Sequence, residues 1–197
     1  MTSPPTKPPT TRQQGAARTR NALIDAGFRL AASGGLVGLS VNRIVEDAAV
    51  SKGSFFHHFG DRASYLVALH RDFHDRILTE ALAIIDGSAP GARRLAIASR
   101  AYLDSCLTNR AVRALLLEAR AEPAINDAVR QRNSDTADLI EPDFTAMGWP
   151  HPRRAAQLWI GMTAEAALLE FDAGHKLTDL RASLARYIDA DPALLGN

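Results

Sequence analysis

The chain has 197 residues, of which 46% are hydrophobic and 23% charged, a composition typical of a globular domain rather than of a disordered or fibrous chain. Charged residues interrupt every apolar stretch before it reaches the length of a membrane span, and the first ten residues lack the apolar core of a secretory signal. The single cysteine, Cys106, excludes an intramolecular disulfide, so we expect a cytoplasmic protein. The net charge is only +1, but residues 1–62 hold eight basic and four acidic residues, which predicts contact with a polyanion.

The N-terminal segment changes character at about residue 16. Residues 1–10 contain four prolines and few apolar side chains, so we expect residues 1–15 to be a disordered tail. From about residue 16, apolar side chains recur at helical spacing. The run Ser33-Gly34-Gly35 ends this first helix, because glycine readily adopts the backbone conformation of a helix C-terminus.

Two short helices follow, separated by a tight turn. Ser40 is a typical N-cap for a helix over about residues 41–48, and Ser51 is one for a helix that ends at about residue 58. Gly60 breaks the chain after this second helix. The sequence therefore predicts a three-helix domain over residues 16–60 that ends in a helix-turn-helix.

The remainder of the chain consists of longer helical patterns. Asp61 caps the first of them, and we expect a break near Glu141-Pro142 because proline disrupts a helix interior. Runs of alternating β-branched and aromatic residues do not occur, so the predicted fold class is all-α, with a helical bundle over residues 61–197. The predicted helices of this bundle are 62–86, 92–108, 110–121, 124–148, 151–173 and 177–188.

The second short helix has the properties that a DNA-reading helix needs. In a helix-turn-helix this element enters the major groove, so it must be short, polar on one side, and small enough at one position for the backbone to approach phosphates. Gly53, between Lys52 and Ser54, has that character. The alternative is a pair of short core helices. The caps, the turn and the long helix that follows all favour DNA binding.

The run AAVSKGSFFHHFGDR, from Ala48 to Arg62, resembles the corresponding segment of the TetR family of transcriptional repressors. The resemblance covers about residues 16–70, and beyond them only the overall helical architecture is similar. It implies about nine helices, a C-terminal domain for ligand binding and dimerisation, and a repressor that a small, mostly apolar ligand releases from a pseudo-palindromic operator.

The resemblance also implies which residues meet the DNA. Residues of the recognition helix and its cap would lie at the DNA surface, and two arginines, on the preceding and following helices, would contact phosphates. The implied DNA-binding residues are Arg43, Ser51, Lys52, Gly53, Ser54, Phe56, His57 and Arg62.

Two positions depart from the pattern of the family. Phe56 stands where the family usually has a tyrosine whose hydroxyl reaches a phosphate, so that contact cannot form here. Ala49 replaces a glycine that is frequent in the turn, and we expect a penalty on the order of 1 kcal/mol if the left-handed conformation is kept.

The last two long helices predict a dimer interface. The helix over 151–173 combines small residues with leucines, and the helix over 177–188 is amphipathic. The resemblance implies that these helices pair across a two-fold axis in a homodimer, because two recognition helices read two half-sites. The alternative is that both apolar stripes belong to the core of one chain.

The resemblance also implies a ligand cavity within the bundle. Its candidate lining is a mostly apolar set suited to a hydrophobic or aromatic ligand. The alternative for each of these residues is ordinary core packing. The candidates are Tyr102, Cys106, Leu117, Phe144, Met147, Trp159 and Met162.

Other functions have weaker support in the sequence. His70 and His74 have a spacing that can hold a metal, but only two ligands are visible, so we expect neither a metal nor a cofactor. The chain has no recognisable set of nucleophile, base and acid, so we expect no enzymatic activity, although a helical small-molecule-binding protein or enzyme without operator binding stays the alternative. A regulator that activates transcription is also compatible with the sequence.

Overall fold

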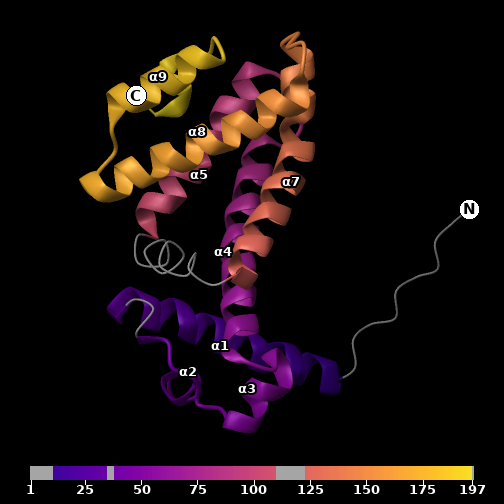
Figure 1. Cartoon of the computed structure of the whole chain (residues 1–197), viewed down its shortest axis with the longest axis vertical. Coiled ribbons are helices and arrows are strands. Elements are labelled where there is room, and N and C mark those ends of the chain that lie inside the picture. The colour runs from indigo at the N-terminus through magenta and orange to yellow at the C-terminus, as the bar shows by residue number, and fades with distance from the viewer. Residues whose placement is uncertain (1–10, 35–37, 110–122, 197) are drawn as a thin grey trace, which may run out of the picture.

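The computed structural model describes residues 11–34, 38–109 and 123–196, and within these ranges it contains eight α-helices, one 3-10 helix and no strand (Figure 1). The predicted all-α fold is confirmed. None of the described helices is both long and apolar enough to cross a membrane. The helices are α1 (Thr11–Gly34), α2 (Val41–Asp47), α3 (Lys52–Phe59), α4 (Arg62–Ile85), α5 (Ala92–Thr108), α7 (Pro123–Ala146), α8 (Pro152–Ala173), α9 (Thr178–Tyr187) and the 3-10 helix η3 (Pro192–Leu195).

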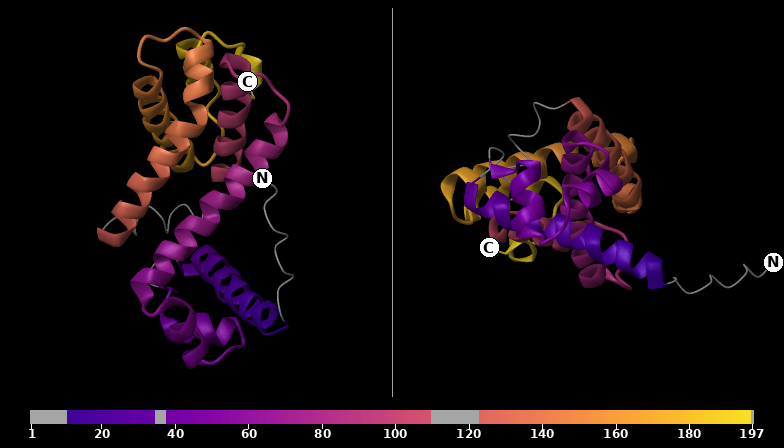
Figure 2. Two further views of the ribbon diagram at one scale, coloured as in Figure 1. Left: turned by 90° about the vertical axis from the view of Figure 1, so that its right-hand side faces the viewer. Right: turned by 90° about the horizontal axis from the view of Figure 1, so that it is seen from below.

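Helix α4 connects the two parts of the molecule. Helices α1, α2 and α3 gather around its first turns, and α5, α7, α8 and α9 gather around its far end (Figures 1 and 2). We call these parts the N-terminal unit and the body. Helix α7 runs beside α4 and reaches toward the N-terminal unit, so two helices approach the junction from the body (Figure 1).

The buried apolar side chains form two clusters, one in each part. Helix α4 contributes Leu66 and Leu69 to the N-terminal cluster, and Phe73 and Ile77 to the body cluster. Ile125, near the start of α7, is also fully buried in the N-terminal cluster. Helices α4 and α7 are therefore packed into the cores at both ends.

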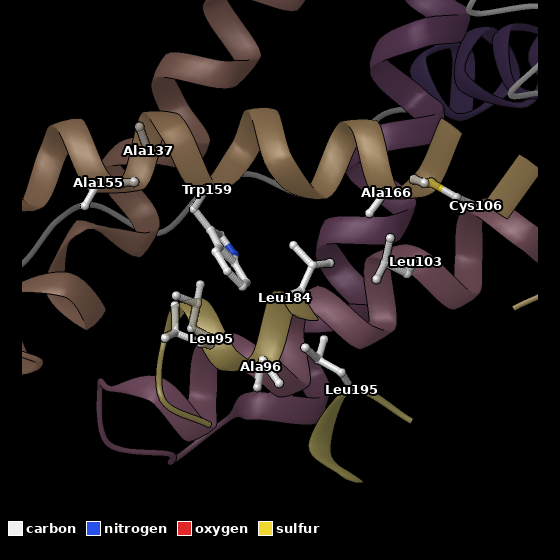
Figure 3. Close-up of a cluster of buried hydrophobic side chains, with 14 of the residues drawn as sticks. Leu95, Ala96, Leu103, Cys106, Ala137, Ala155, Trp159, Ala166, Leu184 and Leu195 are labelled. Atoms are coloured by element: carbon white, nitrogen blue, oxygen red, sulfur yellow. The ribbon is translucent and has the colours of Figure 1, made fainter. Parts of the chain in front are cut away.

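Trp159 of α8 lies in the middle of the body cluster. Figure 3 shows its indole between Leu95 of α5 and Leu184 of α9. The indole Nε1 donates to the hydroxyl of Ser99 at 2.9 Å, so the polar atom of this buried ring has a partner. The body is thus a single core to which α5, α8 and α9 all contribute.

The predicted helix caps are present in the N-terminal unit. The side chains of Ser40, Ser51 and Asp61 accept hydrogen bonds from backbone N–H groups three residues later, at 3.4, 3.1 and 2.7 Å. The hydrogen bonds from Ser64 to the Asp61 carboxylate lower the pKa of Asp61. These caps fix where α2, α3 and α4 begin, and hence the angle at which α3 leaves the unit.

A glycine lets α4 pack closely against α1. A Cβ atom added to Gly27 would lie 2.1 Å from the hydroxyl oxygen of Tyr65, so no larger residue fits there. The Tyr65 hydroxyl donates to the backbone carbonyl of Leu23 at 2.8 Å, and burial raises the pKa of Tyr65. This contact holds the first turns of α4 against the N-terminal unit.

A buried ion cluster fastens α9 to the body. The guanidinium of Arg181, with no exposed surface, donates to both carboxylate oxygens of Glu170 at 2.6 and 2.7 Å. It also donates to Asp104 at 2.7 Å and to the backbone carbonyl of Leu195 at 3.0 Å. One side chain therefore joins α5, α8, α9 and the C-terminal turn.

The structure corrects two of the sequence-based expectations and leaves a third open. Residues 11–15, expected in the disordered tail, form the first turn and a half of α1, because arginine and glutamine support a helix that packing has already nucleated. Helix α7 does not break at Pro142. The neighbouring Asp143 anchors this turn of the helix to α5, because its carboxylate accepts hydrogen bonds from Arg94 at 2.6 and 2.7 Å and from the backbone N–H of Gly91. The helix expected over 110–121 and the tail over 1–10 lie outside the described residues.

Candidate nucleic-acid interface and ligand cavity

Helix α3 has one buried and one exposed face. Phe55 and Phe59 are buried in the N-terminal cluster. Lys52, Gly53, Phe56 and His57 are exposed on the other side of the helix, at positions i, i+1, i+4 and i+5. Aromatic packing of Phe55 and Phe59 thus holds one face of the helix in the core, while Lys52, Gly53, Phe56 and His57 lie on the exposed face.

The glycine in this surface is not required by the fold. A Cβ atom added to Gly53 would meet only the Ser51 hydroxyl, at an ordinary 3.6 Å. The residue is also right-handed helical, so its backbone conformation does not call for glycine. The missing side chain therefore leaves space at the surface of α3 for a binding partner. At Gly27, in contrast, the side chain of Tyr65 occupies the space.

The hydroxyls at the N-terminus of α3 are mutually bonded. Ser51 Oγ caps the helix at the N–H of Ser54 and lies 2.9 Å from Ser54 Oγ. Ser51 is exposed and Ser54 is half-buried. Each hydroxyl has a further lone pair or proton, so both can bond a phosphate oxygen without giving up the cap.

Phe56 is 48% exposed and packs edge-on against Phe55, with the ring centroids 5.5 Å apart. Its ring therefore lies on the surface, where a tyrosine hydroxyl would reach outward. A phenylalanine here offers only apolar contact, so any phosphate contact must come from Lys52 and the serines nearby.

The two predicted phosphate-binding arginines have different surroundings. Arg43 of α2 is exposed, and its guanidinium passes over Gly38. Arg62 is half-buried, and its Nε donates to the backbone carbonyl of Leu39 at 2.9 Å. Arg62 thus holds the loop before α2 to the start of α4 and positions the helix-turn-helix, a role that the sequence did not reveal.

Positive charge lies close to the exposed end of α3. The rings of His57 and His58 are 5.3 Å apart, and Arg20 of α1 lies over the ring of Phe59 at 5.7 Å. Burial, with further contributions from the charges of His57 and Arg20, lowers the pKa of His58. The lowered pKa favours the neutral form of the His58 ring, so the permanent positive charge at this end of α3 is that of Arg20.

The turn between α2 and α3 contains a non-glycine residue in the left-handed region. Ala49 has φ = 52°, and the neighbouring Ala48 has φ = −77°. The family's usual glycine would take this conformation without a steric penalty. Ala49 therefore carries a steric cost in this turn that a glycine would not.

The body contains a half-open cavity of about 150 Å³ between α4, α5, α7 and α8. Of the seven candidate pocket residues, Tyr102 and Trp159 line it. Cys106, Phe144, Met147 and Met162 instead pack in or against the body cluster, since the faces of their helices that carry them point into the core, and Leu117 lies outside the described residues. The apolar part of the lining includes Ile77, Leu82, Leu95, Leu139, Ile140 and Ile160.

Sequence inspection missed the polar groups of this cavity. Arg132 of α7 and His74 of α4 both line it, and an Arg132 nitrogen lies 3.3 Å from His74 Nδ1. The ion pair of Arg94 and Asp143 lies at another part of the lining. The charge-rich pattern of α7 resembles a solvated helix face, and only packing against α4 shows that Arg132 points inward.

The histidines considered as metal ligands lie side by side on α4. Their ring centroids are 4.6 Å apart, and His70 is buried. Among the described residues, no three His, Cys, Asp or Glu side chains are grouped so that they can hold a metal ion. The observed neighbour of His74 is a guanidinium, which makes the pair poorly suited to a cation.

Most of the apolar residues of α8 and α9 that suggested a dimer interface are buried, and other apolar residues of these helices are exposed. The alanines Ala155, Ala156, Ala166 and Ala167, and Leu184 and Ile188 of α9, are buried in the body cluster, as the alternative of an intrachain core requires. On the outer face of α8, Leu158 is 69% exposed, followed at helical spacing by Gly161 and Leu169, and Tyr187 of α9 is 63% exposed. These exposed residues therefore lie on the same two helices for which the sequence predicted a dimer interface, but on the opposite faces from the buried alanines.

Residues 23–69 match the profile of the bacterial regulatory proteins of the tetR family. A transcriptional regulator from Rhodococcus sp. Rha1 is similar in structure, with a TM-score of 0.71, 23% identity, and coverage of 88% of this chain and 94% of that one. RolR in complex with resorcinol has a TM-score of 0.66 at 18% identity, covering 93% and 96% of the two chains. The multidrug binding protein EbrR in complex with imidazole has a TM-score of 0.64 at 22% identity, covering 86% and 94%.

No curated protein matches the chain. The solved structures show a shared fold over almost the whole chain, and the matched profile covers the helix-turn-helix and the first turns of α4.

Proposed function

We propose that this chain, a TetR-family transcriptional regulator by its residues 23–69 and its fold, is a homodimeric repressor that a small, mostly apolar ligand releases from a pseudo-palindromic operator. The observation that carries the proposal is the exposed face of α3, where Lys52 and His57 flank a glycine that the fold itself does not need. Such a face fits a major groove, with Lys52 and the serines at phosphates and His57 at base edges. A repressor acting on chromosomal DNA works in the cytoplasm.

Dimerisation supplies the second recognition helix. A single short α3 contacts few bases, whereas a two-fold dimer reads two half-sites about 34–36 Å apart. The outer surface of α8 and α9 is the face that we propose for this contact, because the large apolar residues Leu158, Leu169 and Tyr187 are exposed there and Gly161 of α8 is small.

Helices α4 and α7 supply the link between ligand and operator. Both line the cavity in the body and are packed into the N-terminal cluster. Leu66 and Leu69 of α4 are buried in the N-terminal cluster, so a displacement of α4 carries the N-terminal unit with it, and Arg76 of α4 also pairs with Asp25 of α1 at the surface at 2.8 Å. A ligand that prefers the displaced arrangement shifts the population of dimers away from the one that fits the operator.

The solved relatives support an internal ligand. RolR and EbrR have this fold and were crystallised with resorcinol and imidazole, each a small single-ring molecule. The half-open cavity among α4, α5, α7 and α8, with a volume of about 150 Å³ and a mainly apolar lining, suits a molecule of this size.

Selection from a random duplex library, followed by fluorescence anisotropy at several salt concentrations, tests the proposal. We expect recovery of an inverted repeat and an affinity that falls steeply with salt. Lys52→Ala should weaken binding to all duplexes and reduce the salt slope by roughly one. Arg93→Ala, which removes an exposed charge from the body, should leave both unchanged. A folded protein that enriches no sequence and whose affinity Lys52→Ala does not change would overturn the proposal.

A further inference from the structure

We infer that Phe56 reads a thymine in each half-site of the operator, with its ring against the C5-methyl group of that base. The inference rests on the proposed function, since it names a base that the operator must contain. It is carried by the exposure of the Phe56 ring, by the packing that supports the ring, and by the open space at Gly53 on the same face of α3.

Phe56 is the one large apolar side chain that is exposed in the described part of the N-terminal unit. The aromatic rings around it, those of Phe55, Phe59 and Tyr65, are all buried. Single exposed apolar side chains are common on protein surfaces, so the position of this one decides its meaning. Phe56 lies one helical turn after Lys52 on the exposed face of α3, which is the face proposed to enter the major groove.

The core supports the ring of Phe56 from one side. This ring meets the ring of Phe55 edge-to-face, with the centroids 5.5 Å apart and an angle of 86° between the planes. Phe55 has no exposed surface and packs against Phe59 and Tyr65, with 5.5 and 5.2 Å between the ring centroids. Because the side chain of Phe56 has few rotatable bonds and rests on a buried ring, it loses little conformational entropy when it contacts a base.

Gly53 leaves space beside this ring. Residues three apart in a helix are neighbours on its surface, so Gly53 and Phe56 lie side by side on the exposed face of α3. Among the described side chains, a Cβ atom added to Gly53 would have only the Ser51 hydroxyl within 4 Å, at 3.6 Å, so the Phe56 ring is not folded back over the glycine. The face therefore presents an apolar ring next to an open space, where a small apolar group fits.

The chemistry of the major groove identifies that group. All four bases present hydrogen-bonding atoms there, and thymine alone also presents a methyl group. A phenyl ring offers no hydrogen-bond donor or acceptor to a base edge, but it makes apolar contact with the thymine methyl group. The missing side chain at Gly53 lets the backbone of α3, and the Phe56 ring with it, approach the base edges closely. Contact with a deoxyribose would instead carry no sequence information, and a comparison of thymine with uracil separates the two contacts.

Replacement of thymine by uracil in the selected operator tests the inference, because uracil lacks the methyl group and keeps the hydrogen-bonding atoms. The thymines are replaced one symmetric pair at a time, and fluorescence anisotropy measures the affinity of the full chain. We expect one pair whose replacement weakens binding roughly tenfold, from the loss of one buried methyl group in each half-site. Phe56→Ala should bind the thymine operator more weakly and should bind the uracil operator equally well.

Lys52→Ala is the matched control, because it removes a proposed phosphate contact from the same face. It should weaken binding to both operators and keep the tenfold ratio between them. Phe56→Gln, which keeps a long side chain without the apolar ring, should lose the preference for thymine as Phe56→Ala does. Circular dichroism verifies that each variant is folded.

The outcomes separate this inference from the proposed function. If uracil is tolerated at every pair, or if either Phe56 variant keeps the tenfold preference for thymine, the inference is wrong and the repressor proposal stands, because the operator is still bound. If the folded natural chain enriches no duplex and binds none, both are wrong.

Discussion

At the scale of single residues, Ala49 and Ala48 form a natural pair for comparison. Ala49 has φ = 52°, where a Cβ atom is unfavourable, and Ala48 has φ = −77°, where it is not. Ala49→Gly should therefore raise the free energy of unfolding by roughly 0.5–1 kcal/mol, after allowance for the larger entropy of glycine in the unfolded chain. Urea denaturation measures this change. Ala48→Gly should instead lower stability, and a destabilised Ala49→Gly would contradict the assigned turn conformation.

Gly53 and Gly27 form a second pair for comparison, one at the proposed DNA-binding surface and one in the packed core. Gly53→Ala should keep or raise stability, by up to about 1 kcal/mol, because alanine is the better helix former and the added methyl group meets no close neighbour. It should nevertheless weaken operator binding, because the methyl group projects toward the DNA. Thermal unfolding and anisotropy together measure both effects.

Gly27→Ala provides the opposite outcome. Its methyl group would overlap the Tyr65 hydroxyl at 2.1 Å, so we expect a loss of about 1–3 kcal/mol in stability. If Gly53→Ala bound the operator as tightly as the natural chain, the exposed face of α3 would not be the DNA-binding face.

At the scale of elements, caps and hydrophobic spacing determined how well the helices could be predicted. Ser40, Ser51 and Asp61 mark the starts of α2, α3 and α4, and each side chain makes the capping hydrogen bond. Pro142 misled the prediction because the anchor that keeps α7 intact is Asp143 bound to Arg94, which lies on a helix 49 residues earlier. Helix propensity depends on neighbouring residues, so it cannot predict a stabilising contact with a residue so distant in the sequence.

The candidate sites differ in the same respect. The helix-turn-helix is a local motif, so the run from Ser51 to Phe59 predicts its own exposed and buried faces. The cavity is built from four helices, and its polar residues, Arg132 and His74, are 58 positions apart. Likewise, the small-residue stripe of α8 is equally compatible with an intrachain core and a dimer interface until the packing of α9 is known.

The buried ion cluster makes the attachment of α9 sensitive to truncation of one partner. Glu170→Ala leaves the enclosed Arg181 without its bidentate partner, so the free energy of unfolding should fall by about 3–5 kcal/mol. Arg186→Ala, which removes only the exposed partner of Asp189 on the same segment, should have little effect. Guanidinium denaturation measures both. Equal effects would mean that the cluster does not hold α9 in place.

The same cluster gives the protein an acid-sensitive component. Burial by itself would raise the pKa of Asp104, but its hydrogen bond from Arg181 and the nearby Lys176 outweigh burial and lower the pKa. Because the pKa is lower in the folded than in the unfolded state, Asp104 stabilises the fold above its unfolded pKa of about 3.9 and loses this contribution as the pH falls through the folded value. The difference in the free energy of unfolding between the natural chain and Asp104→Asn should thus be larger at pH 5 than at pH 3. A gap that widens on acidification would reverse the assigned shift.

At the scale of the whole molecule, operator recognition depends on which face joins two copies. Leu158 is 69% exposed on α8, and Ile84 is 59% exposed on α4. A charge introduced at an interface core is left buried and unpaired, so Leu158→Glu should convert the dimer to a monomer, and Ile84→Glu should not. Analytical ultracentrifugation measures the mass of each variant.

Because one α3 supplies only half of the contacts, the monomeric variant should lose sequence-specific binding while keeping weak, salt-sensitive binding to any duplex. A dimer that persists in Leu158→Glu but dissociates in Ile84→Glu would place the two-fold axis on α4 and require a different spacing of the recognition helices.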